Sequence, residues 1–200
     1  MNAILLSIQP QWLAKILNGE KTVEIRKTAL HEGDEVHIYC TKGKPYLYDY
    51  DGFHLTPTRS WSELHDNGDR EWFSIDEVGE LNGKVVAKFI VGKVRQITHD
   101  ITSGIYFKAL CQDLNEEELL KQSCLRWDEL EKYLLSSKND IIYAHEITHL
   151  EIFDKPRELG EYFKAREITM SMTKGGHQKL TMYDKITHAP QSYMKAWVEE

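Results

Sequence analysis

The first part of the chain alternates between short apolar runs and an amphipathic segment. Residues 3–8 are mostly apolar and end at Gln9-Pro10, which predicts a buried strand. Residues 11–18 place apolar side chains at helical spacing, and Pro10 suits the first turn of a helix because no hydrogen bond is lost there. Residues 22–26 alternate between polar and apolar, which predicts a second strand.

The same patterns recur further along. They predict strands over 35–40, 83–94 and 141–153, helices starting at Asn115 and over 127–135, a short helix over 154–159 and a closing segment over 181–198. Because the middle of 83–94 is apolar on both faces, we expect this strand to run through the core. The Met- and Gly-rich stretch 170–176 predicts a loop.

Residues 41–82 break this regularity and are interpreted as an insertion with local structure of its own. The insertion is rich in aromatic residues. These are Tyr46, Tyr48, Tyr50, Phe53, Trp61, Trp72 and Phe73. They either line a ligand cleft or form a local cluster under the loop, and the second arrangement is the more common.

Size and composition favour a single domain over residues 1–200. The chain has 200 residues, of which 41% are hydrophobic and 28% charged. No apolar run is long enough to span a membrane, and no signal peptide is apparent, so we expect a cytoplasmic protein. Cys40, Cys111 and Cys124 are odd in number and lack paired spacing, which argues against a disulfide framework or a zinc site.

The net charge of −7 argues against binding nucleic acid by bulk attraction. Charge is unevenly distributed, however. Residues 113–132 are acidic, whereas residues 174–195 lean basic. A local cationic patch could therefore hold a few phosphates, with an affinity that depends strongly on salt.

The most concentrated chemistry lies at Gly19, Lys21, Glu24 and Arg26. Gly19 is suited to end the preceding helix because glycine tolerates left-handed dihedrals. Glu24 and Arg26 then share the polar face of the predicted strand, and Lys21 can reach over it. On spacing alone, such charges are more often simply solvated than functional.

This Gly-x-Lys-x-x-Glu-x-Arg arrangement, after a strand and a helix, resembles the signature of the ASCH domain family, a branch of the PUA-like superfamily. The opening residues 5–17 and the late block 141–159 are also similar to the family. The late block departs where members often carry Trp-His and this chain has His145 and Glu146. The segment 189–193 resembles a closing motif of longer phage-type and bacterial members, with Ala189 in place of a Pro and Tyr193 in place of a Trp.

The resemblance implies an α+β fold, a PUA-like partly open β-barrel with flanking helices, and a cleft beside residues 19–26. It also implies RNA or a nucleotide as partner, with no cofactor. The expected binding residues are Lys21, Glu24, Arg26, Ser7, Trp12 and Tyr143. Arg26 offers a planar fork for phosphate, Lys21 a point charge, and Glu24 an acceptor for an exocyclic amine. Trp12 could stack on a base, although a Trp at helical spacing is more often part of the core.

Two other functions stay open. The chain could be a hydrolase that cleaves RNA or the amide of N4-acylcytidine, with Lys21 and Glu24 in acid–base roles. In the deacylating ASCH subgroup a Thr nucleophile occupies the position of Glu24, so that nucleophile is missing here. Alternatively, the acidic helices could dock a protein partner, in which case reversing the charges of Glu117 and Glu118 would abolish function.

A metal site at residues 145–149 (His-Glu-Ile-Thr-His) is not expected. On a helix, His145 and His149 would lie one turn apart with Glu146 as a base, as in zinc metalloproteases. The β-branched neighbours favour a strand instead, and no third ligand is evident. Oligomeric state is not indicated by the sequence.

Overall fold

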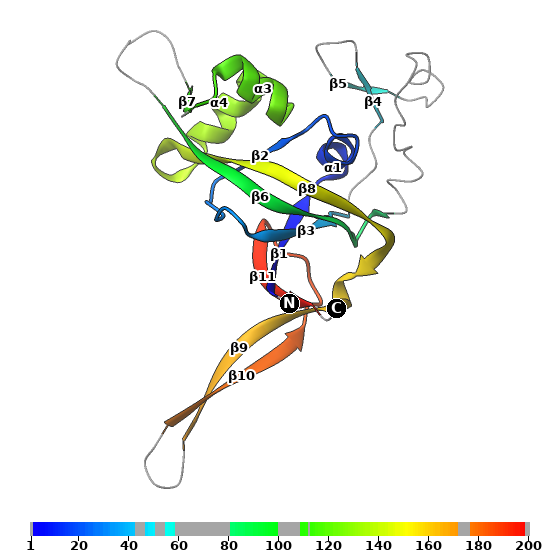
Figure 1. The fold of residues 1–200 in the computed structure, drawn as a ribbon, viewed down its shortest axis with the longest axis vertical. Coiled ribbons are helices and arrows are strands. Elements are labelled where there is room, and N and C mark those ends of the chain that lie inside the picture. Colours follow the sequence, from blue (N-terminus) through cyan, green and yellow to red (C-terminus); the bar gives the residue numbers. More distant parts are fainter. Residues whose placement is uncertain are drawn as a thin grey trace.

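The computed structural model describes residues 2–42, 47–50, 55–58, 81–99, 109–111, 113–171 and 177–198. Nine strands form the main sheet (Figure 1). They are β1 (Asn2–Ile8), β2 (Val23–Arg26), β3 (Glu35–Cys40), β6 (Lys84–His99), β7 (Ala109–Cys111), β8 (Ile141–Glu158), β9 (Tyr162–Ser171), β10 (His177–Lys185) and β11 (Tyr193–Val198). The helices are α1 (Pro10–Leu17), α3 (Glu116–Ser123) and α4 (Trp127–Leu135), with short 3₁₀ turns at Lys138–Asp140 and Leu159–Glu161.

The sheet is mixed and open. Its order is β10-β9-β11-β1-β3-β6-β8-β2, with β7 beside β6. β1 and β3 are parallel, joined through α1 and β2, and the other neighbours are antiparallel. Within the described residues the path ends at β2 and β10 and does not close. The predicted α+β class with a partly open sheet and flanking helices is therefore confirmed.

Each predicted strand has a counterpart, and β6 is central as its apolar faces indicated. β6 pairs with β3, β7 and β8 and buries Val85, Phe89 and Val91. α1 packs its apolar face against the cluster around β1, β3 and β6, to which Leu13 and Ile16 belong. No helix in the described part of the chain is long and apolar enough to cross a membrane.

The acidic segment 114–136 folds as the helical pair α3–α4 and covers β2 and β8. Leu119, Leu130 and Leu134 are fully buried and pack against Val23 and Ile25 of β2. This packing is why the short strand β2 is held firmly, although it lies at the edge of the sheet.

Asn115 begins α3 with a capping box. Its side chain accepts a hydrogen bond from the Glu118 amide at 2.8 Å, and the Glu118 carboxylate accepts from the Asn115 amide. We expect Asn115→Ala to lower the free energy of unfolding by about 1 kcal/mol, because the first turn loses an acceptor. Urea denaturation measures the change, and Asn115→Asp, which keeps an acceptor, is the control. Equal losses in both variants would contradict the assigned role.

The helix predicted over 154–159 is wrong, because β8 continues to Glu158. Val85 pairs with Arg157 whereas Ala87 pairs with Ile152, so residues 153–156 bulge out between these pairings. Pro156 lacks an amide hydrogen and fits such a bulge, where no ladder hydrogen bond is required. Long-range pairing with β6 thus overrides the local helical pattern.

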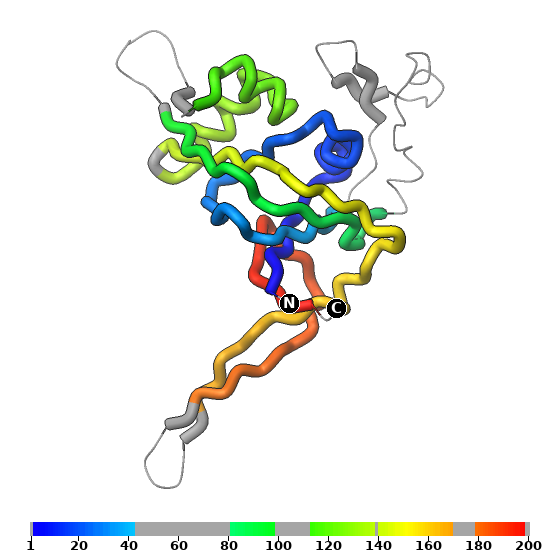
Figure 2. The backbone as a smooth tube through the Cα atoms, viewed as in Figure 1, coloured from blue at the N-terminus to red at the C-terminus, as the bar shows by residue number. Residues whose placement is uncertain are grey.

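β9 and β10 form a two-stranded arm that extends away from the body of the molecule (Figures 1 and 2). The loop predicted over 170–176 is partly wrong, since Met170 and Ser171 belong to β9; the rest lies outside the described residues. In the 41–82 insertion, β4 (Leu47–Tyr50) and β5 (Leu55–Thr58) pair as a separate two-stranded sheet. The side chains of the aromatic residues in the insertion also lie outside what is described. Cys40 and Cys124 are free thiols.

Candidate functional site

The turn between α1 and β2 sets the position of the signature residues. Gly19 adopts φ 73°, and its amide donates to the Ile16 carbonyl at 3.0 Å. The amides of Glu20 and Lys21 both donate to the Lys15 carbonyl, at 2.9 and 3.0 Å. The predicted helix end at Gly19 is thus confirmed, and the turn delivers Lys21 directly to the start of β2.

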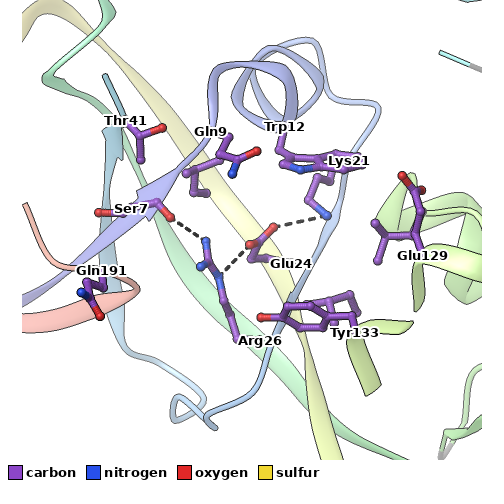
Figure 3. Close-up of a pocket in the computed structure, with 13 residues that line it drawn as sticks. Ser7, Gln9, Trp12, Lys21, Glu24, Arg26, Thr41, Glu129, Tyr133 and Gln191 are labelled. Atoms are coloured by element: carbon purple, nitrogen blue, oxygen red, sulfur yellow. Dashed lines mark hydrogen bonds and ion pairs between the residues drawn. The ribbon is translucent and has the colours of Figure 1, made fainter. Parts of the chain in front are cut away.

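The alternation along β2 separates the core from the site. Val23 and Ile25 point into the cluster beneath α3 and α4, as predicted. Glu24 and Arg26 lie on the opposite face, where both line a cavity (Figure 3). The three charged side chains of the signature do converge, as their spacing predicted.

Lys21 is fully engaged in holding the site together. Its Nζ donates to the carbonyls of Val23 at 3.0 Å and Ser123 at 2.8 Å, and it pairs with Glu24 Oε2 at 3.2 Å. An ammonium has three protons, so these three acceptors use them all. With 3% of its side chain exposed, Lys21 ties α3 to β2 and orients Glu24. This differs from the expected free point charge for a ligand phosphate.

Glu24 is a buried carboxylate held between two cations. Its Oε1 lies 2.8 Å from Arg26 Nε, and Oε2 faces Lys21. Burial raises the pKa of this carboxyl, but Lys21 and Arg26 together outweigh burial and hold the pKa below its usual range. Glu24 is therefore ionised at neutral pH and has lone pairs left to accept further hydrogen bonds.

Arg26 offers its remaining guanidinium edge to the cavity. Nε faces Glu24, and Nη2 donates to the Ser7 carbonyl at 2.8 Å. Within the described residues Nη1 has no partner. The Ser7 hydroxyl in turn donates to the Pro190 carbonyl at 2.7 Å. This ties the closing segment to the site and places Gln191 on the cavity wall.

The cavity has a volume of about 360 Å³. Of the six predicted binding residues it brings together Ser7, Trp12, Lys21, Glu24 and Arg26. Trp12 packs against the core cluster, as a Trp at helical spacing usually does, and it also lines the cavity. The other lining residues are Ile8, Gln9, Ile25, Thr41, Leu125, Glu129, Tyr133 and Gln191.

Tyr143 is the predicted residue that does not line this cavity. It lies beside Arg26 in the β2–β8 register, and its ring contacts that of His145, with centroids 6.5 Å apart. The aromatic wall opposite Trp12 is instead Tyr133 of α4 (Figure 3). The position of Tyr133 beside the apolar Leu134 in the predicted helix 127–135 could have indicated that this ring faces the protein and not the solvent.

His145 contacts the backbone of Glu24, and both of its ring nitrogens take part in hydrogen bonds within the protein. It lies on strand β8, not on a helix, so the metalloprotease geometry is absent. Its Nε2 accepts from the Leu30 amide at 2.9 Å, and its Nδ1 therefore donates to the Glu24 carbonyl, 3.2 Å away. His149 is exposed and adopts a left-handed φ of 51°. No group of three potential metal ligands occurs among the described residues.

We expect stability to fall as the pH drops below about 6.5. Burial lowers the pKa of His145, and also that of His37. The unfolded chain then binds these protons more readily, so the stability is complete above the unfolded pKa and is lost below it, by up to about 1.4 kcal/mol per pH unit for each histidine. Urea midpoints measured from pH 8 to 5 should show this slope, and His145→Gln should flatten it. The control is His31→Gln, because the His31 side chain is 88% exposed; an equal flattening there would contradict the argument.

No known family profile matches the chain, and no curated protein matches it. Two solved structures from Zymomonas mobilis are similar to it. One is a crystal structure of ASCH, 13% identical, covering 78% of this chain and 73% of that chain with a TM-score of 0.43. The other is a single-residue variant of the same protein, 13% identical, covering 78% and 76% with a TM-score of 0.41. Both are ASCH structures. They belong to the family whose signature the sequence resembles, while the function of the site has to be argued from its own contacts.

Proposed function

We propose that the chain binds RNA or a nucleotide in the cavity beside Glu24 and Arg26. The observation that carries this proposal is the fixed Arg26–Glu24 pair. It presents a guanidinium edge and a carboxylate together, inside a cavity that also holds two aromatic rings. The volume of about 360 Å³ lies within the usual range for small-molecule sites.

Each chemical part of a nucleotide has a suitable contact. The free edge of Arg26 suits a phosphate or a base edge, and Glu24 can accept from an exocyclic amine. Trp12 and Tyr133 offer flat surfaces for a base that is unstacked from its neighbours. The amides of Gln9 and Gln191 add paired donors and acceptors at the rim.

Binding is better supported than hydrolysis. An acid–base role needs a group that can take or give a proton near neutral pH. All three protons of Lys21 have acceptors, and the lowered pKa of Glu24 makes it a weak base. The Ser7 hydroxyl donates to the Pro190 carbonyl, and no basic side chain among the described residues is hydrogen-bonded to it.

Acidic residues of α3 and α4 also make contacts that stabilise these helices. Glu118 caps α3, and Glu129 accepts from the Arg126 amide at 2.9 Å and lines the cavity. Reversing the charges of Glu117 and Glu118 would therefore remove the Glu118 cap and disturb the start of α3, so that variant could not isolate a docking surface.

A thermal-shift panel tests the proposal. It should compare nucleosides, N4-acetylcytidine, nucleoside 5′-monophosphates and short single-stranded RNAs. Because a ligand that binds only the folded state stabilises it by RT ln(1 + L/Kd), where L is the free ligand concentration, tighter ligands at equal concentration raise Tm more. We therefore expect monophosphates or RNA to raise Tm, and nucleosides to raise it less. No shift with any of these probes would overturn the proposal. Acetate release from N4-acetylcytidine would favour the hydrolase instead.

A further inference from the structure

A second cavity, of about 370 Å³, lies where the β9–β10 arm meets the body. Tyr193, Lys195 and Trp197 of β11 line it, and so does Tyr183 of β10. The three residues of β11 alternate along the strand and therefore share one face. This cavity has no lining residue in common with the first.

Aromatic rings from neighbouring strands gather on this face. The Trp197 ring lies 5.6 Å from Tyr183 and 5.9 Å from Phe163, centroid to centroid, so β9, β10 and β11 each contribute a ring. The three rings lie outside the buried hydrophobic clusters, and Tyr183 is 53% exposed. Core packing therefore does not account for them. Trp197 and Phe163 are half-buried beside the exposed Tyr183. Aromatic rings on a sheet face are the feature by which many proteins stack single-stranded bases.

The two carboxylates that line this cavity, Asp34 and Glu35, are held by hydrogen bonds, whereas the lining cation Lys195 is exposed. Asp34 pairs with His31, and its Oδ2 also accepts from the His31 amide at 2.8 Å. The Glu35 carboxylate accepts from His37 at 2.8 Å and faces Lys88 at 3.8 Å. The Lys195 residue is exposed, and its ammonium has no hydrogen bond or ion pair within the described part of the chain. It projects between Tyr193 and Trp197 on the shared face.

We propose that this cavity is a second nucleotide site, in which a base stacks on Trp197 and Tyr183 and its phosphate contacts Lys195. The ligand class is a single-stranded nucleic acid. The two linings come close along the chain: Arg26 lines the first cavity and Ala29 the second, and three residues span at most about 11 Å. Because the lining residues differ, this site stands or falls separately from the first.

The test is fluorescence anisotropy with the full chain at several salt concentrations. The probes are fluorescein-labelled decamers of uridine RNA and thymidine DNA. We expect Tyr183→Ala to weaken binding by at least about fivefold, because a stacking partner is lost, whereas Tyr183→Phe keeps the ring and the affinity. Lys195→Ala should reduce the slope of log affinity against log salt by about 0.7, and Lys195→Arg should restore it. Both positions are exposed, so the variants keep the fold, which circular dichroism checks.

If Tyr183→Ala binds with the affinity of the natural chain and Lys195→Ala keeps its salt slope, the second site is overturned. If Tyr183→Ala loses the decamer while Arg26→Met retains it, the second site stands, and the first proposal is then decided by the monophosphates of the thermal-shift panel. The reverse pattern, or a chain that binds neither decamer, rejects the second site alone. Weaker DNA than RNA binding, with the same variant effects, supports the site and shows that the 2′-hydroxyl is read.

Discussion

Lys21→Met is expected to lower the free energy of unfolding by about 3–5 kcal/mol. The variant keeps much of the side-chain volume but removes the ammonium that three acceptors share. The carbonyls of Val23 and Ser123 then stay buried without this donor, and Glu24 keeps Arg26 as its one remaining cation. Such losses are large because an incompletely paired charge is left inside the protein.

The penalty should depend on pH in a specific direction. In the natural chain the lowered pKa of Glu24 contributes stability above the unfolded pKa, near 4.5, and that contribution is lost as the pH falls through the folded pKa. Without Lys21, burial is less opposed and the folded pKa rises. Protonation of Glu24 then removes the buried, incompletely paired charge from the variant. The difference in the free energy of unfolding between the two proteins should therefore shrink as the pH falls toward 4.

Urea denaturation at pH 7 and pH 4.5 measures both effects. Lys27→Met is the matched control, since the exposed Lys27 ammonium has one carbonyl partner at 2.9 Å and should cost less than about 1 kcal/mol. A Lys21→Met protein as stable as the Lys27→Met control would show that the buried ammonium does not hold α3 to β2.

Arg26→Met is expected to weaken binding of the RNA or monophosphate found in the panel by at least about thirtyfold. The variant removes the guanidinium edge that faces the cavity, while Glu24 keeps its contact with Lys21. Arg26→Lys should recover part of the affinity, because it restores the charge but not the planar fork.

Titration calorimetry against the same ligand measures this loss. Arg166→Met is the control, because Arg166 pairs with Asp184 on the arm, away from the cavity lining. If Arg26→Met binds the ligand as tightly as the natural chain does, the ligand does not bind at the signature residues.

The sequence predicted the frame of the site but not every role in it. Alternation along residues 22–26 predicted that Glu24 and Arg26 share a face, because strand geometry fixes which side chains point together. The function of Lys21 was not predictable in the same way. Its partner at Ser123 is about a hundred positions away, and only the packing of α3 against β2 brings that carbonyl to it.

The errors have the same origin. Tyr143 shares a strand face with His145, as expected, but the cavity opens toward α4 and takes Tyr133 as its wall. The helix expected over 154–159 yielded to pairing with β6 across a bulge. In each case contacts with a segment far away in the sequence determined the structure, and a local sequence pattern carries no information about such contacts.

The pairing of β1 with β11 has a consequence for biosynthesis. Residues 2–6 find their partners at 193–197, almost the whole length of the chain away. On the ribosome, β1 can pair with β3 before β11 is made, yet its other edge stays uncovered until residues 193–197 emerge. Such distant pairing is slow to form, and it exposes a nascent apolar strand to aggregation for nearly the entire time of translation.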